Sequence, residues 1–239
     1  MQNLNDKTAL ITGGSKGIGY GIAEAFLAEG MKVAITSRST EAAQTAAQSL
    51  DPDQSGRVLP IAADVRNYAS QQAAIQQVLS TWGQLDVVIA NAGVGHFASI
   101  EELSPEQWQE TIDTNLTGVF YSTKASIDAL KASQGYLITI ASLAGTNFFA
   151  RGSAYNASKF GLVGFTQAAM LDLRQYGIKT STVMPGSVAT YFNNHVPNDA
   201  DAWKIQPEDL GQLCVDLLKM PARTLPSKVE VRPSMPPTR

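Results

Sequence analysis

Short hydrophobic runs recur along the whole chain, and the gap between each pair is long enough for a helix. Most of the runs are continuous rather than alternating between polar and apolar residues, which is typical of strands covered on both faces. They fall at Thr8–Thr12, Lys32–Ser37, Val58–Ala62, Leu85–Asn91, Tyr136–Ser142, Thr180–Met184 and Lys228–Val231. We therefore predict seven parallel strands, joined by right-handed crossovers, in one sheet with helices on both faces.

The segments between these runs carry helix signals. Ser104, Pro105 and Gln107 supply an N-cap, a proline at the first helical position and the glutamine of a capping box. Pro207 begins another predicted helix, whose apolar stripe includes Cys214. We expect this single cysteine to be a small buried hydrophobe rather than a reactive thiol.

Composition narrows the class of protein. We find no repeat and no linker, so the prediction is one α/β domain of the Rossmann type, doubly wound, over residues 1–239. The chain has 18 basic and 21 acidic residues, a net charge of −3, which argues against a non-specific nucleic-acid binder. It has no leader-like start and no run of ~18 apolar residues, so we expect a cytoplasmic protein without a membrane partner.

A glycine-rich loop follows the first predicted strand and opens a helix. Glycines here permit a tight turn and close approach of the backbone, while the first N–H groups of the helix favour a phosphate. Ligands of open parallel sheets bind beyond the carboxyl ends of the strands. We predict a dinucleotide site in the loop at residues 12–19, formed by Gly13, Ser15, Lys16, Gly17, Ile18 and Gly19.

The same loop also satisfies the G-x-S-x-G pattern of a hydrolase nucleophile elbow, with Ser15 as the nucleophile. That interpretation needs an acid and a histidine later in the chain, and only His96 and His195 exist. The elbow would also sit on the first strand, with no preceding strand to supply an oxyanion hole. We therefore keep it as a minor alternative.

The end of the second strand indicates which dinucleotide is bound. An NAD site places an acidic residue there to bind the ribose 2′-hydroxyl, but this chain has Ser37 followed by Arg38. A guanidinium fits a 2′-phosphate through paired charged hydrogen bonds, and Lys16 adds a second cation. We predict NADP(H) rather than NAD as the cofactor.

Three residues predict acid–base chemistry. Tyr155 and Lys159 are four residues apart, on one face of a helix that we expect to begin after Gly152. A cation within ~4–6 Å lowers the pKa of an acid by roughly 1–3 units, so we expect Lys159 to lower the pKa of the Tyr155 phenol from its ordinary ~10. Ser142 ends the preceding strand, where its hydroxyl can hold a substrate oxygen. Such pairs also occur by chance on helix surfaces.

Taken together, these motifs resemble the short-chain dehydrogenase/reductase family over nearly the whole chain. The resemblance implies a catalytic set of Asn115, Ser142, Tyr155 and Lys159, in which Asn115 holds a water of the proton relay and Lys159 holds the nicotinamide ribose. It implies adenine contact at Asp64 and carboxamide contact at Val188 and Thr190. The implied cofactor-binding residues beyond the glycine loop are Ser37, Arg38, Asp64, Val65, Asn91, Ala92, Gly93, Tyr155, Lys159, Pro185, Gly186, Val188 and Thr190.

The activity implied by the resemblance is hydride transfer between NADP(H) and a small carbonyl or alcohol substrate, with Tyr155 as the proton donor. The alternative within the family is a 3-oxoacyl-[acyl-carrier-protein] reductase. The alternative from another class is a non-catalytic NADP-binding regulator. The resemblance implies a homodimer or homotetramer and a substrate lid at about residues 190–206, and we expect no metal site. The substrate and the roles of His96 and His195 stay open.

Overall fold

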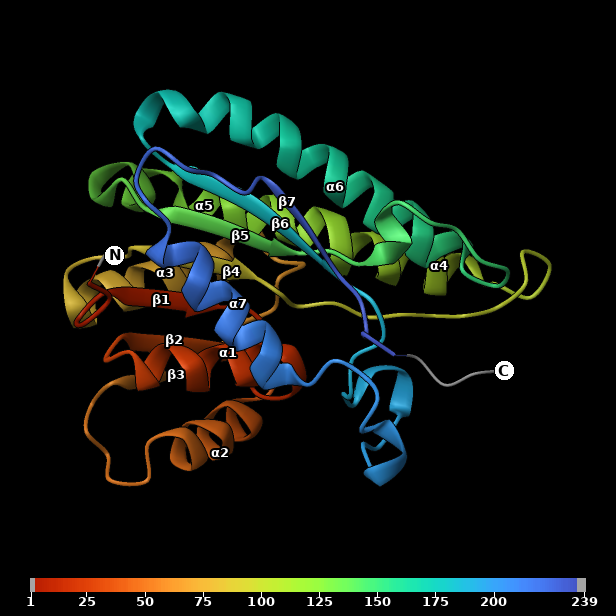
Figure 1. Cartoon of the computed structure of the whole chain (residues 1–239), viewed down its shortest axis with the longest axis horizontal. Coiled ribbons are helices and arrows are strands. Elements are labelled where there is room, and N and C mark those ends of the chain that lie inside the picture. The colour runs from red at the N-terminus through yellow and green to blue at the C-terminus, as the bar shows by residue number, and fades with distance from the viewer. Residues whose placement is uncertain (1–2, 236–239) are drawn as a thin grey trace.

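The computed structural model describes residues 3–235, and in that part of the chain seven strands form one sheet (Figure 1). All neighbouring strands are parallel, in the order β3-β2-β1-β4-β5-β6-β7. The strands are β1 (Thr8–Ile11), β2 (Lys32–Ser37), β3 (Val58–Ala62), β4 (Val87–Ala90), β5 (Tyr136–Ile140), β6 (Lys179–Pro185) and β7 (Lys228–Val231). The sheet order reverses between β1 and β4, which is where ligands of doubly wound sheets bind.

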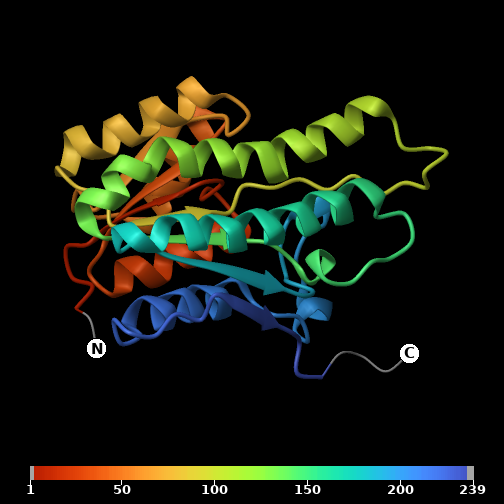
Figure 2. The ribbon, with the colours of Figure 1, turned by 90° about the horizontal axis from the view of Figure 1, so that it is seen from above.

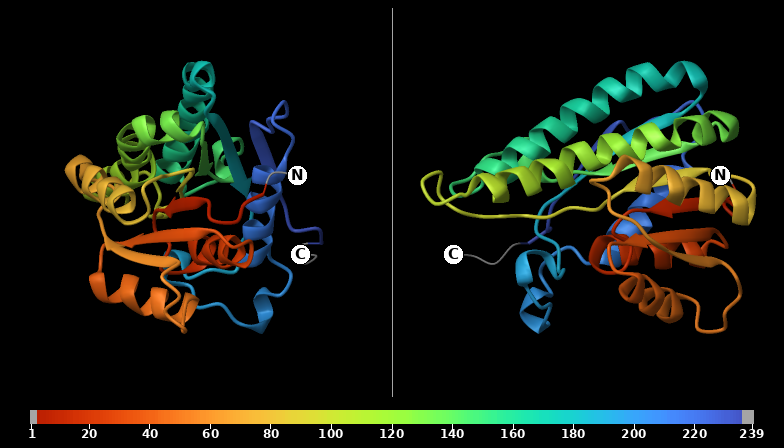
Figure 3. Two further views of the ribbon diagram at one scale, coloured as in Figure 1. Left: turned by 90° about the vertical axis from the view of Figure 1, so that its left-hand side faces the viewer. Right: turned by 180° about the vertical axis from the view of Figure 1, so that it is seen from behind.

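Helices cover both faces of the sheet, as the end-on view in Figure 3 shows. One layer contains α1 (Gly17–Ala28), α2 (Thr40–Leu50) and α7 (Pro207–Lys219). The other contains α3 (Tyr68–Trp82), α5 (Gly118–Ser133) and α6 (Ser153–Leu173), which lie side by side in Figure 2. The short helix α4 (Pro105–Ile112) precedes α5. None of the helices in residues 3–235 has the length and apolar character that a membrane span requires.

The core lies on both sides of the sheet. Ile11 packs in the cluster shared with α1 and α7, whereas its neighbour Leu10 packs in the cluster shared with α3 and α5. Successive side chains of a strand point to opposite faces, so every position of β1 is buried. This double burial explains why the strands read as continuous hydrophobic runs.

The predicted fold is confirmed, and the differences lie at the ends of strands. The predicted strands Leu85–Asn91 and Tyr136–Ser142 are shorter in the structure, where β4 ends at Ala90 and β5 at Ile140. The polar residues Asn91 and Ser142 have therefore left the sheet and lie just beyond its edge. Of the predicted 1–239 domain, residues 1, 2 and 236–239 lie outside the described part of the chain.

Two of the predicted local signals also hold. Ser104 accepts a hydrogen bond from the Gln107 backbone, and the Gln107 side chain bonds back to Ser104, so the capping box at α4 is complete. Cys214 is fully buried in the α7 core, and this burial raises the pKa of its thiol to about 12. A thiol in that position stays protonated and unreactive, as predicted.

Candidate active site

The glycine loop is fastened to the end of β4. The Asn91 side-chain amide donates hydrogen bonds to the carbonyl oxygens of Thr12 and Gly13, at 2.9 and 3.1 Å. A Cβ added at Gly19 would lie only 2.6 Å from the Asn91 amide nitrogen, so no other residue fits there without displacing it. Gly13 has a φ of +64°, a left-handed conformation that favours glycine. The glycine loop and the segment that begins at Asn91 thus form one structural unit.

The start of α1 fits the phosphates of a dinucleotide. Its N-cap residue, Lys16, makes no side-chain capping bond, and its first turn contains no acidic residue. The N–H groups of that turn are therefore available to an anion at the positive end of the helix dipole. A Cβ at Gly17 would lie 3.3 Å from the Thr190 methyl group, so the base of the predicted lid packs against the same loop.

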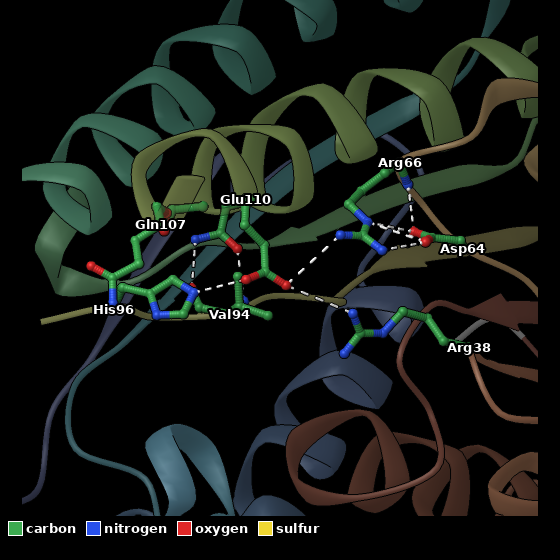
Figure 4. A network of polar contacts seen from close by, with 9 residues as sticks. Arg38, Asp64, Arg66, Val94, His96, Gln107 and Glu110 are labelled. Carbon is green, nitrogen blue, oxygen red and sulfur yellow. Dashed lines mark hydrogen bonds and ion pairs between the residues drawn. The ribbon is translucent and has the colours of Figure 1, made fainter. Parts of the chain in front are cut away.

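Four charged side chains meet at the ends of β2 and β3 (Figure 4). Arg66 binds both carboxylate oxygens of Asp64, at 2.7 to 3.1 Å, and these hydrogen bonds hold the pKa of the Asp64 carboxyl below its ordinary value. Glu110 of α4 extends toward the same place, with one carboxylate oxygen 3.8 Å from guanidinium nitrogens of both Arg38 and Arg66. The cations and anions at this end of the site therefore balance in number.

This network adds a partner to Asp64. Its carboxylate is paired with Arg66, and the contact with adenine stays a prediction. We did not predict Arg66 or Glu110 as site residues. Arg66 is only two positions past Asp64, so its pairing with Asp64 could have been predicted from the sequence. Glu110 belongs to α4, and nothing in the local sequence indicates that it lies near Arg38.

The predicted catalytic helix begins at Ser153, directly after Gly152. It carries Lys159 into the interior, where the ammonium group donates a 3.0 Å hydrogen bond to the Ile140 carbonyl at the end of β5. The side chain is buried, and burial lowers the pKa of Lys159 to about 8. Its nitrogen lies 5.7 Å from the centre of the Tyr155 ring.

Tyr155 corrects one of our predictions. We expected the neighbouring lysine to lower the pKa of the phenol, but burial raises the pKa of Tyr155 to about 12, with the Ser142 hydroxyl acting in the opposite direction. Lys159 is directed to the Ile140 carbonyl and its own charge is disfavoured by burial, so it does not compensate. The phenol is therefore held in its protonated form.

Ser142 and Asn115 are each fixed by the backbone. The Ser142 hydroxyl accepts a hydrogen bond from the Ala144 N–H at 3.1 Å, just past the end of β5. Asn115 lies in a π-helical turn, Asp113–Thr117, a form often found at functional sites. Its amide bonds both the N–H and the carbonyl of Val94, at 2.8 and 2.9 Å, and the Ser158 hydroxyl at 3.0 Å. A buried amide with these partners cannot rotate freely.

The remaining predicted residues lie along the same edge of the sheet. Gly93 connects the two halves of the site, because a Cβ there would be 3.3 Å from the Asn115 oxygen and 3.8 Å from the Lys159 nitrogen. The residues that end or follow strands at this edge are Ser37 and Arg38 of β2, Asp64 and Val65 of β3, Asn91, Ala92 and Gly93 of β4, Ser142 of β5, and Pro185, Gly186, Val188 and Thr190 of β6.

Comparison with known proteins decides the family. A family model described as short chain dehydrogenase matches residues 7–201. The chain belongs to the short-chain dehydrogenase family. Within it, D-beta-hydroxybutyrate dehydrogenase of Cupriavidus necator is 37% identical over 188 residues, which are 78% of this chain and 72% of that protein. This short-chain dehydrogenase is therefore an oxidoreductase.

Two solved structures resemble this short-chain dehydrogenase closely. An alcohol dehydrogenase from the archaeon Thermococcus sibiricus, complexed with 5-hydroxy-NADP, has a TM-score of 0.91 and 30% identity, covering 98% of this chain and 100% of that one. A 3-ketoacyl-(acyl-carrier-protein) reductase from Brucella melitensis, complexed with NADH, has a TM-score of 0.87 and 26% identity, covering 97% and 98%.

Family membership contradicts the hydrolase alternative. The contacts of the two histidines that a hydrolase would need point the same way. His96 pairs with Glu110 at 2.9 Å, and His195 pairs with Asp201 at 2.5 Å in the predicted lid. Each imidazole thus has a carboxylate partner of its own. Within residues 3–235 the structure also contains no group of three metal-binding side chains.

Proposed function

We propose that this short-chain dehydrogenase transfers a hydride between NADP(H) and a carbonyl or alcohol substrate, with Tyr155 as the proton donor. The observation that carries the proposal is the convergence of Tyr155, Ser142 and Lys159 on the same sheet edge as the glycine loop. The solved relatives that contain 5-hydroxy-NADP and NADH support a nicotinamide cofactor. An assay of NADPH consumption with a panel of ketones tests the proposal, because a regulator binds the cofactor without consuming it.

The protein groups have separate tasks in this mechanism. A nicotinamide cofactor would supply or accept the hydride, and the loop at the start of α1 would hold its phosphates. In reduction, the Tyr155 hydroxyl gives its proton to the carbonyl oxygen, and the Ser142 hydroxyl holds that oxygen in place. Burial keeps the phenol protonated, which is the form that reduction uses.

Lys159 and Asn115 would return a proton to the proton donor after each reaction. Lys159 has its pKa lowered to about 8, so it exchanges a proton readily near neutral pH. Asn115, fixed against Val94, lies beside Gly93 together with the lysine nitrogen. A water held by Asn115 would connect the lysine to solvent, and Lys159 would hold the ribose of the cofactor.

The first prediction concerns cofactor choice. Arg38 is exposed enough to reach a ligand, with 62% of its side chain accessible, and follows the end of β2. Losing a charged hydrogen-bond partner costs about 1.5–3 kcal/mol, so Arg38→Ala is expected to raise the KM for NADPH by roughly ten- to hundredfold. The KM for NADH in the same variant serves as the control and is expected to stay nearly unchanged. Equal use of both cofactors by the unmodified protein would overturn the NADP preference.

A second prediction follows from Glu110. Its carboxylate lies 3.8 Å from both Arg38 and Arg66, so it competes with a 2′-phosphate for the same guanidinium groups. Exposed ion pairs are worth about 0.2–1 kcal/mol each, so Glu110→Gln is expected to lower the KM for NADPH roughly two- to fivefold. Glu102→Gln is the matched control, because Glu102 pairs with Arg151 instead. A higher KM for NADPH in Glu110→Gln would show that Glu110 orients the arginines rather than competing for them.

A further inference from the structure

The Tyr155 ring lies within a group of aromatic side chains, Phe97, Phe149, Tyr155 and Phe192, which we call the aromatic cluster. The ring centre of Tyr155 is 5.4 Å from that of Phe97 and 5.6 Å from that of Phe192. Phe97 and Phe192 are 6.2 Å apart, and Phe149 is 5.9 Å from Phe97. The cluster therefore surrounds the proposed proton donor with apolar surface.

The three phenylalanines of the aromatic cluster come from three separate segments around Tyr155 of α6. Phe97 follows β4, Phe149 precedes α6, and Phe192 begins the 3-10 turn Phe192–Asn194 of the lid. Gly95 makes this packing possible, because a Cβ there would lie 2.6 Å from the Phe192 ring and 3.0 Å from the Phe97 ring. In Figure 1 the loop before α4 and the lid turns both extend beyond the same end of the sheet. Phe192 is thus the one member carried by the lid.

The cluster residues retain exposed ring surface. Phe149 is 48% exposed, and Phe97 and Phe192 are half-buried. A substrate whose carbonyl oxygen reaches the Tyr155 hydroxyl, at roughly 2.6–3.2 Å, must place its neighbouring atoms within a few ångströms of these rings. Aromatic rings at such separations attract one another beyond the effect of area alone. The substituents of the carbonyl carbon therefore meet apolar, largely aromatic surface.

The basic side chains on the neighbouring segments are already paired with carboxylates. Arg151, two residues past Phe149, lies 3.2 Å from Glu102. In the lid, Lys204 and His195 both contact the buried carboxylate of Asp201, at 2.5 Å each. A substrate carboxylate would have to compete with these acids for its counter-charge, and the desolvation of its own charge among phenyl rings is costly.

We propose that the substrate is an uncharged ketone or aldehyde that carries an aromatic ring next to the carbonyl group, packed against the accessible surface of Phe97 and Phe192 beside Tyr155. This inference rests on the proposed function and adds the substrate class to it. The reaction balances as one hydride to the carbonyl carbon, from NADPH, and one proton to the oxygen, from Tyr155, which solvent then restores.

The first test is a substrate panel with purified protein and NADPH. It compares an aryl methyl ketone, the cyclohexyl methyl ketone of matched size, acetoacetate as a 3-oxo acid, and a 3-oxoacyl carrier protein. We expect the aryl ketone to have the highest kcat/KM, about tenfold or more above acetoacetate. A highest rate with acetoacetate or with the carrier protein overturns the inference but leaves the proposed function standing. No turnover with any carbonyl, while NADPH still binds, overturns the proposed function itself.

The second test uses variants of the aromatic cluster. Phe97→Leu and Phe192→Leu are each expected to raise the KM for the aryl ketone about two- to tenfold. The KM for butanone is expected to stay within about twofold of its value in the unmodified protein. Phe148→Leu is the matched control, because Phe148 is 86% exposed and adjoins the cluster in sequence only. Gly95→Ala displaces the Phe192 ring without removing any aromatic group, and the same selective loss is expected. NADPH binding, followed by protein fluorescence, is expected to be unchanged in every variant. Equal losses for aryl ketone and butanone would contradict the inference.

Discussion

Replacing Tyr155 with phenylalanine is expected to reduce turnover by ~10²–10⁴-fold and to leave NADPH binding intact. The variant keeps the ring that packs against Phe97 and Phe192, at 5.4 and 5.6 Å, and removes only the hydroxyl. The measurement is steady-state kcat with a saturating ketone, together with a titration of NADPH by fluorescence.

Tyr136→Phe is the matched control for this variant. The Tyr136 hydroxyl is also buried and bonds a serine, Ser181, at 2.7 Å, but it lies at the start of β5 rather than at the site edge. Its loss is expected to cost about 0.5–1.5 kcal/mol of stability without changing turnover. A Tyr155→Phe variant that retains full activity would remove the tyrosine from the mechanism.

Lys159→Met is expected to lower turnover by at least ~10²-fold, because the proton relay and the ribose contact are both lost. In the cofactor-free protein, the same change is expected to raise the free energy of unfolding by about 1–2 kcal/mol at pH 7. The lysine is buried, and methionine fills a similar volume without a charge to desolvate. The measurements are kcat and urea unfolding of the same two proteins.

The pH dependence of that stability difference has a defined sign. The unfolded chain keeps the Lys159 proton up to the ordinary pKa of 10.5, whereas the folded protein releases it at about 8. Between these pH values the unfolded state binds more protons, so the unmodified protein gains stability as the pH rises. The advantage of Lys159→Met is therefore expected to be complete below pH 8 and to shrink toward pH 10.5.

Lys179→Met supplies the comparison for this result. Lys179 begins β6 and its ammonium also faces a backbone carbonyl, that of Pro221 at 3.5 Å, but it is far more exposed. Burial lowers the pKa of Lys179 as well, so we expect its replacement to leave turnover unchanged and to alter the pH dependence of stability in the same direction as Lys159→Met, but by less because Lys179 is more exposed. If the stability advantage of Lys159→Met over the unmodified protein grew with pH, the result would contradict the burial of a charged lysine.

The parts of this fold that sequence reveals are those governed by local rules. Double burial makes each strand a continuous apolar run, and the capping box at Ser104 uses residues three positions apart, so both could be predicted. The glycine loop could be predicted because its position between strand and helix restricts what it binds. The predicted ends of β4 and β5 were wrong, because Asn91 and Ser142 continue the hydrophobic runs in sequence but lie beyond the sheet in space.

The parts that sequence does not reveal depend on tertiary contacts. The spacing of Tyr155 and Lys159 correctly places them on one helix, yet it contains no information about Phe97 and Phe192, which flank the phenol. Burial raises the pKa of Tyr155, which is opposite to the expected direction. Glu110 likewise approaches Arg38 across a separation of 72 positions, which no local pattern encodes.

The most direct test of hydride transfer follows the hydrogen itself. NADPH deuterated at both C4 positions of the dihydronicotinamide is incubated with the protein and an aryl methyl ketone, and the alcohol is examined by mass spectrometry and NMR. The account predicts one deuterium on the carbinol carbon for each NADPH consumed, and ~10²–10⁴-fold less of this deuterated alcohol when Tyr155→Phe replaces the unmodified protein over the same interval. Alcohol without deuterium, or consumption of NADPH with no alcohol, would contradict it.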